Sequence, residues 1–206
     1  MGNGLPAKRV RVLILASLGV LAVAVAAWLL VPRLLPYRYH GFAMEPTKPV
    51  ADFTLAGPDG KPVKLSDFRD KLTVLYFGYT YCPDVCPTTL AELAQGLKGL
   101  GRRADKVQVV MVTVDPERDT PEALAKYVAN FDPRFIGLSG TPDQIAAAAT
   151  PLGIYYQKHD GTAATGYLVD HTASVAVIDQ NGYLRLVFPF GTSGEDIASD
   201  LAHLLN

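Results

Sequence analysis

Cys82 and Cys86 are the only cysteines of the chain, and they lie four residues apart in the sequence YTYCPDVCP. A thiolate is both a nucleophile and a ligand for soft metals, so the pair could carry thiol–disulfide chemistry or bind a metal ion. Three residues separate the cysteines here, whereas the thioredoxin redox motif has two. This spacing can place both sulfur atoms on one side of a helical turn, where Cu(I) would be the preferred metal. If Cys86 begins a helix, the helix dipole is expected to lower its pKa.

A third metal ligand has to come from elsewhere in the chain, and the four histidines are the candidates. His171 stands out because it directly precedes a predicted strand over 173–179, in a turn expected to face the cysteines. His40 falls in a predicted linker, His203 in a predicted helix, and His159 in a predicted turn. Position alone leaves the choice of ligand open. Structural zinc sites have four ligands, and the residue count still allows a Cys2His2 set.

Strand and helix patterns alternate along the chain from residue 52 onward. The apolar run LTVLYFGY over 72–79 predicts a buried central strand that ends just before the cysteines. Leucines at helical spacing in 88–100 predict that a helix follows them. The other predicted elements are a hairpin over 53–65, a buried strand over 107–114, helices capped by Thr120 and Thr141, a hairpin over 174–188 and a helix over 194–205.

This order of elements predicts an α/β fold with a central mixed sheet flanked by helices. The thioredoxin-like fold has such an order. In open α/β sheets, functional groups gather beyond the carboxyl ends of the strands. The two cysteines follow a predicted central strand, so they are expected at that position.

Length and charge limit the classes of function. The 206 residues suit one domain with an appendage, and the net charge of −1 gives no field that would attract nucleic acid. Two cysteines are too few for a disulfide-stapled scaffold. A purely structural disulfide between them would close a very small loop and stabilise little.

The N-terminal region has the pattern of a membrane anchor. Residues 12–31 carry no charged side chain, and a helix of this length crosses the hydrocarbon of a bilayer. Basic residues in 8–11 place the N-terminus in the cytoplasm by the positive-inside rule. A cleaved signal peptide is the alternative, because Ala24–Ala26 looks like a processing site. The expected organisation is a cytoplasmic tail over 1–11, a transmembrane helix over 12–31, a linker over 32–48 and a domain over 49–206.

Four strings in this order resemble the Sco/SenC family. They are DFTLAGPDGKPVKLSDFRDK from residue 52, YFGYTYCPDVCPTTLAEL from 76, VTVDPERDTPEAL from 112 and VDHTASVAVID from 169. The resemblance covers roughly residues 50–205. It implies that Cys82 and Cys86 bind copper as thiolates and that His171 completes the site.

The resemblance also implies a function and a location. The function is that of a copper chaperone that delivers copper to the binuclear copper (CuA) centre of cytochrome c oxidase subunit II. In some members of the family, a thiol–disulfide role accompanies or replaces this transfer. A periplasmic protein could supply the copper. With the predicted anchor and its basic N-terminal flank, the expected location is the bacterial inner membrane, with the C-terminal domain on the periplasmic side.

Two enzymatic alternatives use the same thiols. A thiol–disulfide oxidoreductase would keep the cysteines of the oxidase subunit reduced, although thioredoxins keep a proline where Asp170-His171-Thr172 is expected to lie. A peroxiredoxin-like peroxidase would need Thr or Ser three residues before its reactive cysteine, and Tyr79 occupies that position.

Two carboxylates near the expected site have open roles. Asp84, between the cysteines, is read either as a carboxylate at a helix N-terminus or as a charge that tunes the site. Asp115 is read as part of a structured loop rather than as a direct site residue.

Overall fold

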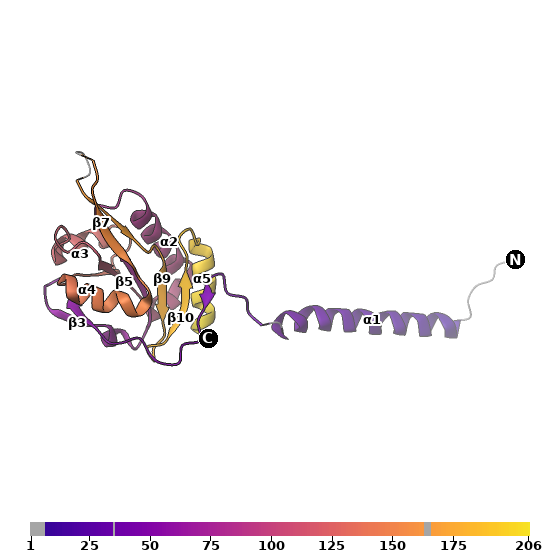
Figure 1. Cartoon of the computed structure of the whole chain (residues 1–206). Helices are drawn as coiled ribbons and strands as arrows, with labels where there is room; N and C mark the ends of the chain where they lie inside the picture. The colour runs from indigo at the N-terminus through magenta and orange to yellow at the C-terminus, as the bar shows by residue number, and fades with distance from the viewer. Residues whose placement is uncertain (1–6, 35, 163–165) are drawn as a thin grey trace. The chain divides into compact units, whose positions relative to one another are not determined.

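The structure is a computed structural model that describes residues 7–34, 36–162 and 166–206. The chain forms two compact units, Met1–Arg38 and Tyr39–Asn206. The first unit contains helix α1, Ala7–Leu34, which includes the predicted anchor (Figure 1). Within the described residues, no helix has the combination of length and apolar character needed to cross a membrane.

A six-stranded mixed sheet forms the centre of the second unit, with strand order β1-β10-β9-β4-β5-β6. β4 pairs in parallel with β5, and β5 with β6. On the other edge of β4, each successive pair is antiparallel: β9 with β4, β10 with β9 and β1 with β10. Helices flank this sheet (Figure 1), which confirms the predicted α/β, thioredoxin-like architecture. The strands are β1 Phe42–Ala43, β4 Leu72–Gly78, β5 Val107–Thr113, β6 Ile136–Leu138, β9 Val175–Ile178 and β10 Leu184–Phe188.

The central strands and the helices lie close to their predicted positions. All seven residues of β4 and all seven of β5 are buried, as continuous apolar runs in a parallel pair should be. The Oγ1 atoms of Thr120 and Thr141 accept hydrogen bonds from the amides of Ala123 and Gln144, so both predicted helix caps are confirmed. The helices are α2 Val85–Leu100, α3 Pro121–Ala129, α4 Pro142–Ala149 and α5 Gly194–Leu204, with 3-10 turns at Leu65–Phe68, Gly101–Lys106 and Thr150–Leu152.

Two hairpins lie outside the large sheet. The predicted hairpin near the start of the domain consists of β2 Thr54–Ala56 and β3 Pro62–Lys64. A second hairpin, β7 Tyr156–His159 with β8 Leu168–His171, was not predicted. Most of its side chains are partly or fully exposed, so the sequence lacks the alternation of buried and exposed residues that marks a strand. His159 and His171 therefore end strands, and neither lies in the turn that the sequence pattern predicted.

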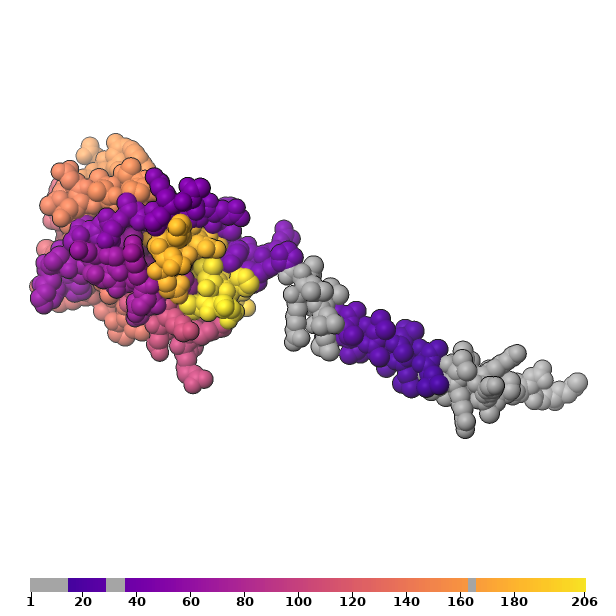
Figure 2. All heavy atoms as spheres, turned by 90° about the horizontal axis from the view of Figure 1, so that it is seen from below, coloured from indigo at the N-terminus to yellow at the C-terminus, as the bar shows by residue number. Residues whose placement is uncertain are grey.

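Part of the segment that we expected to be a linker is folded. Strand β1 pairs with β10, and Figure 2 shows the purple segment that leads into β1 beside the yellow C-terminal helix α5. The fully buried carboxylate of Asp200 on α5 accepts hydrogen bonds from the backbone amides of His40 and Gly41, each 2.9 Å long. The folded unit therefore begins at Tyr39, before the boundary that we expected at residue 49.

The contact between His40 and Asp200 is expected to weaken as the pH rises. His40 Nδ1 lies 2.9 Å from Asp200 Oδ1, and this hydrogen bond, with the nearby charge of Asp196, raises the pKa of His40. A raised pKa in the folded state contributes stability at pH values below the ordinary histidine pKa, and this contribution is lost as the pH rises through the raised pKa. Amide exchange protection over 39–44 should therefore be higher at pH 6 than at pH 8.5. His40→Gln should abolish this difference, and an unchanged difference in the variant would show that His40 is not its cause.

Candidate metal centre

The two cysteines lie at the junction between strand β4 and helix α2. Cys82 is in the connecting loop and half-buried, whereas Cys86 is in the first turn of α2 and fully buried. The backbone amide of Cys86 donates a hydrogen bond of 3.4 Å to Cys82 Sγ. Both thiols are free. The loop thus brings the two sulfur atoms together at the carboxyl end of a central strand, as predicted.

His171 reaches the thiols from the end of β8. Its Nε2 atom lies 3.4 Å from Cys86 Sγ, and its Nδ1 lies 3.2 Å from the carbonyl oxygen of Thr172. A carbonyl oxygen only accepts hydrogen bonds, so in the neutral imidazole Nδ1 carries the hydrogen and the lone pair of Nε2 faces the thiols. The rings of Tyr76 and Tyr79 pack edge-on against the imidazole, with centroids 6.1 and 5.9 Å away. These contacts hold the ring in the orientation that a metal ligand needs.

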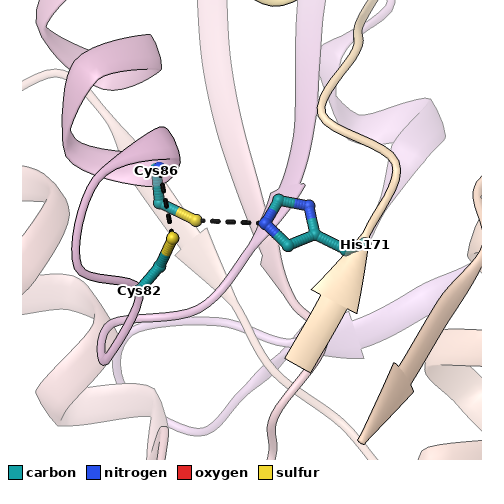
Figure 3. A group of neighbouring side chains, drawn as sticks. All are labelled: Cys82, Cys86 and His171. Atoms are coloured by element: carbon teal, nitrogen blue, oxygen red, sulfur yellow. Dashed lines mark hydrogen bonds between the residues drawn. The ribbon is translucent and has the colours of Figure 1, made fainter. Parts of the chain in front are cut away.

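The ligand atoms of Cys82, Cys86 and His171 all lie within 4.8 Å of one another, and the three side chains point toward a common centre (Figure 3). Elsewhere in the described parts of the chain, no other three His, Cys, Asp or Glu residues are close enough to hold a metal ion. The structure therefore brings together the three residues that the sequence analysis selected, and their binding of a metal stays a prediction.

The other histidines take no part in this group. His40 bonds to Asp200, and His203 packs against Tyr39. His159 lies 3.1 Å from the carboxylate of Asp170 and lines a cavity of about 230 Å³. Cys82 and His171 line the same cavity, so the candidate centre is open to solvent on that side.

The two thiols differ in acidity. A hydrogen bond from the Cys86 thiol is the largest cause that lowers the pKa of Cys82, to about 3. The same hydrogen bond, together with burial, raises the pKa of Cys86. The expectation that the helix N-terminus would lower the pKa of Cys86 is therefore wrong, because the buried thiol keeps its proton and donates it to the more exposed sulfur. Binding of a metal by both sulfurs would release that proton.

A buried carboxylate that the sequence analysis did not single out holds the cysteine loop in place. Asp119 accepts hydrogen bonds from the backbone amide of Thr80, at 3.0 Å, from the Thr80 hydroxyl and from the Thr113 hydroxyl, at 2.7 Å. It is fully buried and lies in the loop between β5 and α3. Asp119 therefore connects the loop that carries Cys82 to the end of the neighbouring strand. Asp119 ends the sequence DPERD within one of the four family-like strings, and this was the only sign of its importance. The sequence could not show which hydrogen-bond donors its carboxylate contacts.

The two carboxylates with open roles now have defined surroundings. Asp84 is the N-cap residue of α2, but its carboxylate makes no capping hydrogen bond, and the Thr88 hydroxyl lies 3.4 Å from it. Asp115 is fully buried and accepts hydrogen bonds from Arg118 Nε and, at 2.6 Å, from the Tyr167 hydroxyl. This agrees with the interpretation of Asp115 as part of a structured loop.

Gly78, the last residue of β4, leaves room beside its Cα for the sulfur atom of Cys86 and the ring of Tyr76. A Cβ atom at this position would lie 2.9 Å from Cys86 Sγ and 2.8 Å from Tyr76 Cε1. Glycine inside a strand pattern indicates such a close approach.

We expect Gly78→Ala to displace the Cys86 sulfur and to lower the free energy of unfolding by about 1–3 kcal/mol, the usual effect of overpacking a core. Copper affinity, measured by competition titration, should fall as well. Gly137→Ala is the matched control, because its Cβ would lie 2.6 Å from Leu124 Cγ in the core of β6 and α3. The control should lose stability and keep its affinity; equal affinities in the two variants would show that Gly78 does not shape the centre.

Known proteins share both the sequence and the fold. A profile of the SCO1/SenC family matches residues 43–206. The mitochondrial SCO2 homologue of Mus musculus is 36% identical over 152 residues, which span 73% of this chain and 60% of that protein. The structure of Bradyrhizobium japonicum ScoI with copper bound has a TM-score of 0.69 at 39% identity, and the match covers 76% of this chain and 99% of that one. Apo Sco1 from Thermus thermophilus has a TM-score of 0.73 at 43% identity, and the match covers 82% of this chain and 98% of that one. The chain therefore belongs to the SCO1/SenC family.

Proposed function

We infer that this protein is a copper carrier that binds one copper ion through Cys82, Cys86 and His171 and passes it on during the assembly of cytochrome c oxidase. One observation carries the proposal: two thiol sulfurs and one imidazole nitrogen lie within 4.8 Å of one another. Two thiolates suit Cu(I), and an imidazole adds affinity for Cu(II). The copper-bound Bradyrhizobium relative supports the choice of metal.

The arrangement suits transfer of the ion rather than permanent storage. Three protein ligands leave a coordination position open to a ligand of the acceptor. Cys82 is the more exposed sulfur and lines the open cavity with His171, whereas Cys86 is buried. An incoming thiolate can therefore enter from the cavity and replace the protein ligands one at a time, so the ion never becomes free in solution.

The recipient in this proposal is the binuclear copper (CuA) centre of oxidase subunit II. Family membership supports it, because Sco proteins are described as cytochrome c oxidase assembly proteins. The donor in this proposal is a periplasmic copper protein.

The proposed location is the bacterial inner membrane, with the folded unit on the periplasmic side. The charge-free stretch 12–31 lies within helix α1 and follows a cluster of basic residues, which supports an anchor with a cytoplasmic N-terminus.

A second candidate function, thiol–disulfide exchange, is favoured by the unequal acidity of the thiols. Cys82, whose pKa is lowered to about 3, is half-buried, and Cys86 lies beside it with its proton retained. The Cys82 thiolate would attack a substrate disulfide to form a mixed disulfide. Cys86, after losing its proton, would then form the Cys82–Cys86 disulfide and release the substrate as a dithiol. Oxidation of the pair would prevent copper binding.

Copper titration of the reduced full chain in detergent, beside His171→Ala, separates the two functions. A carrier should bind one Cu(I) and one Cu(II) per chain in separate titrations, and the variant should lose most of its Cu(II) affinity. A chain that binds no copper but reduces disulfides equally well with and without His171 would establish the oxidoreductase instead.

A further inference from the structure

Arg118 connects the two segments that supply the ligands of the centre. It lies in the loop between β5 and α3, and only 18% of its side chain is exposed. Its Nε donates to the buried carboxylate of Asp115, and one terminal nitrogen donates a hydrogen bond of 3.1 Å to the backbone carbonyl of Tyr167. Tyr167 directly precedes β8 and lies four residues before His171. One side of the guanidinium thus holds the hairpin that carries the histidine.

The same guanidinium packs against the cysteine loop. Its central carbon lies 3.8 Å from the ring centroid of Tyr167, 4.7 Å from that of Tyr81 and 5.7 Å from that of Tyr79. Tyr81 is the residue before Cys82, so the cation touches rings from both segments. The other terminal nitrogen is buried and has no hydrogen-bond partner among the described residues.

Further contacts hold Tyr167 in this position. Its hydroxyl donates a hydrogen bond of 2.6 Å to Asp115, the same carboxylate that accepts from Arg118. The ammonium group of Lys158 on β7 lies 4.8 Å from the Tyr167 ring centroid. We name Asp115, Arg118 and Tyr167 the arginine clamp.

We propose that the arginine clamp positions His171 against the two cysteines and thereby sets the affinity of the centre for Cu(II). This inference rests on the proposed copper site and adds a positioning residue to it. The thiolates of Cys82 and Cys86 both come from one loop and the helix that follows it. Binding of Cu(I) therefore depends little on the position of the β7–β8 hairpin. Binding of Cu(II) depends on the imidazole of His171, which lies at the end of β8 in that hairpin. Loosening the clamp should therefore affect Cu(II) far more than Cu(I).

Arg118→Gln in the full chain tests the clamp. We expect Cu(II) to bind about 10–100-fold more weakly, which is the usual effect of removing a residue that orients a metal ligand, while Cu(I) affinity stays within about threefold. The Cu(II)–thiolate charge-transfer band and the copper hyperfine splitting should shift. Arg118→Lys should give an intermediate Cu(II) affinity. Lysine keeps a positive charge near the tyrosine rings, but its single ammonium group cannot reproduce the separate hydrogen bonds to Asp115 and to the Tyr167 carbonyl.

Two further variants separate positioning from folding. Arg134→Gln is the matched control, because Arg134 donates to Asp132 through Nε at 2.9 Å and a terminal nitrogen at 2.7 Å, on a loop away from the centre. It should leave both affinities unchanged. Tyr167→Phe removes only the hydroxyl from the clamp and should cause a smaller change in the same direction as Arg118→Gln.

The metal-free protein gives an independent measurement. Arg118→Gln should speed amide exchange over 167–171 and leave exchange in β4 and β5 unchanged. The proposal is overturned if Arg118→Gln keeps the wild-type Cu(II) spectrum and affinity, or if it weakens Cu(I) and Cu(II) equally along with a lower melting temperature. A wild-type chain that binds neither form of copper would instead disprove the proposed function itself, and the clamp's role with it.

Discussion

Replacing Cys86 by alanine is expected to weaken Cu(I) binding by more than about a hundredfold, since loss of a direct ligand should exceed the 10–100-fold effect of losing an orienting residue. Cys86 is the buried sulfur, 3.4 Å from His171 Nε2, and no other thiol in the chain can replace it. Competition titration with a Cu(I) chelator measures the change. A variant that keeps the wild-type affinity would show that Cys82 and His171 suffice and that the centre has been assigned wrongly.

The same substitution should change the acidity of the remaining thiol. The Cys86 thiol is the largest cause of the lowered pKa of Cys82, so its removal should raise the Cys82 pKa from about 3 toward the ordinary cysteine value. In the wild type, the alkylation rate of Cys82 should hardly depend on pH between 5 and 9, because the thiolate is already formed. In Cys86→Ala, the rate should rise with pH until the new pKa is reached.

Cys86→Ser is the matched control for these two effects. A serine hydroxyl can still donate a hydrogen bond to Cys82, but it is a poor ligand for Cu(I). The serine variant should therefore lose copper as the alanine variant does and keep part of the lowered Cys82 pKa. Identical alkylation profiles in the two variants would show that the hydrogen bond from residue 86 does not lower this pKa.

Asp119→Ala is expected to lower the free energy of unfolding by about 3–5 kcal/mol. The fully buried carboxylate accepts from the Thr80 amide, the Thr80 hydroxyl and the Thr113 hydroxyl, and its loss leaves these donors without an acceptor in a buried region. Urea denaturation of the metal-free protein measures the loss. Copper affinity should fall as well, because the Thr80 segment leads directly into the cysteine loop.

Asp59→Ala is the control for Asp119→Ala. Asp59 also accepts both a backbone and a side-chain hydrogen bond, from Lys61 at 3.1 and 2.6 Å, but it lies in an exposed turn. Water can replace those bonds, so the control should change stability little. A similar small effect at Asp119 would show that the loop relaxes to satisfy its donors in another way.

The sequence by itself determined the elements whose signals are local. The continuous apolar runs that became β4 and β5 indicated buried strands, and Thr120 and Thr141 marked two helix starts correctly. Each of these signals depends on residues within about one helical turn or along one strand. The cysteine spacing likewise indicated two sulfurs that could share one site, and the position of His171 together with the family resemblance made it the predicted third ligand.

Only the tertiary structure decided how distant segments meet. His171 contacts Cys86 across 85 positions in the sequence, and Asp200 holds the His40 segment across 160. The β7–β8 hairpin shows no strand pattern because most of its side chains are partly or fully exposed, and Arg118 contacts it from the distant β5–α3 loop through the Tyr167 carbonyl. The order of the thiol acidities was also beyond the sequence, because burial and hydrogen bonding of Cys86 outweigh its position at a helix N-terminus. Local patterns specify backbone conformation, whereas the desolvation and partner of each group arise only when the chain is packed.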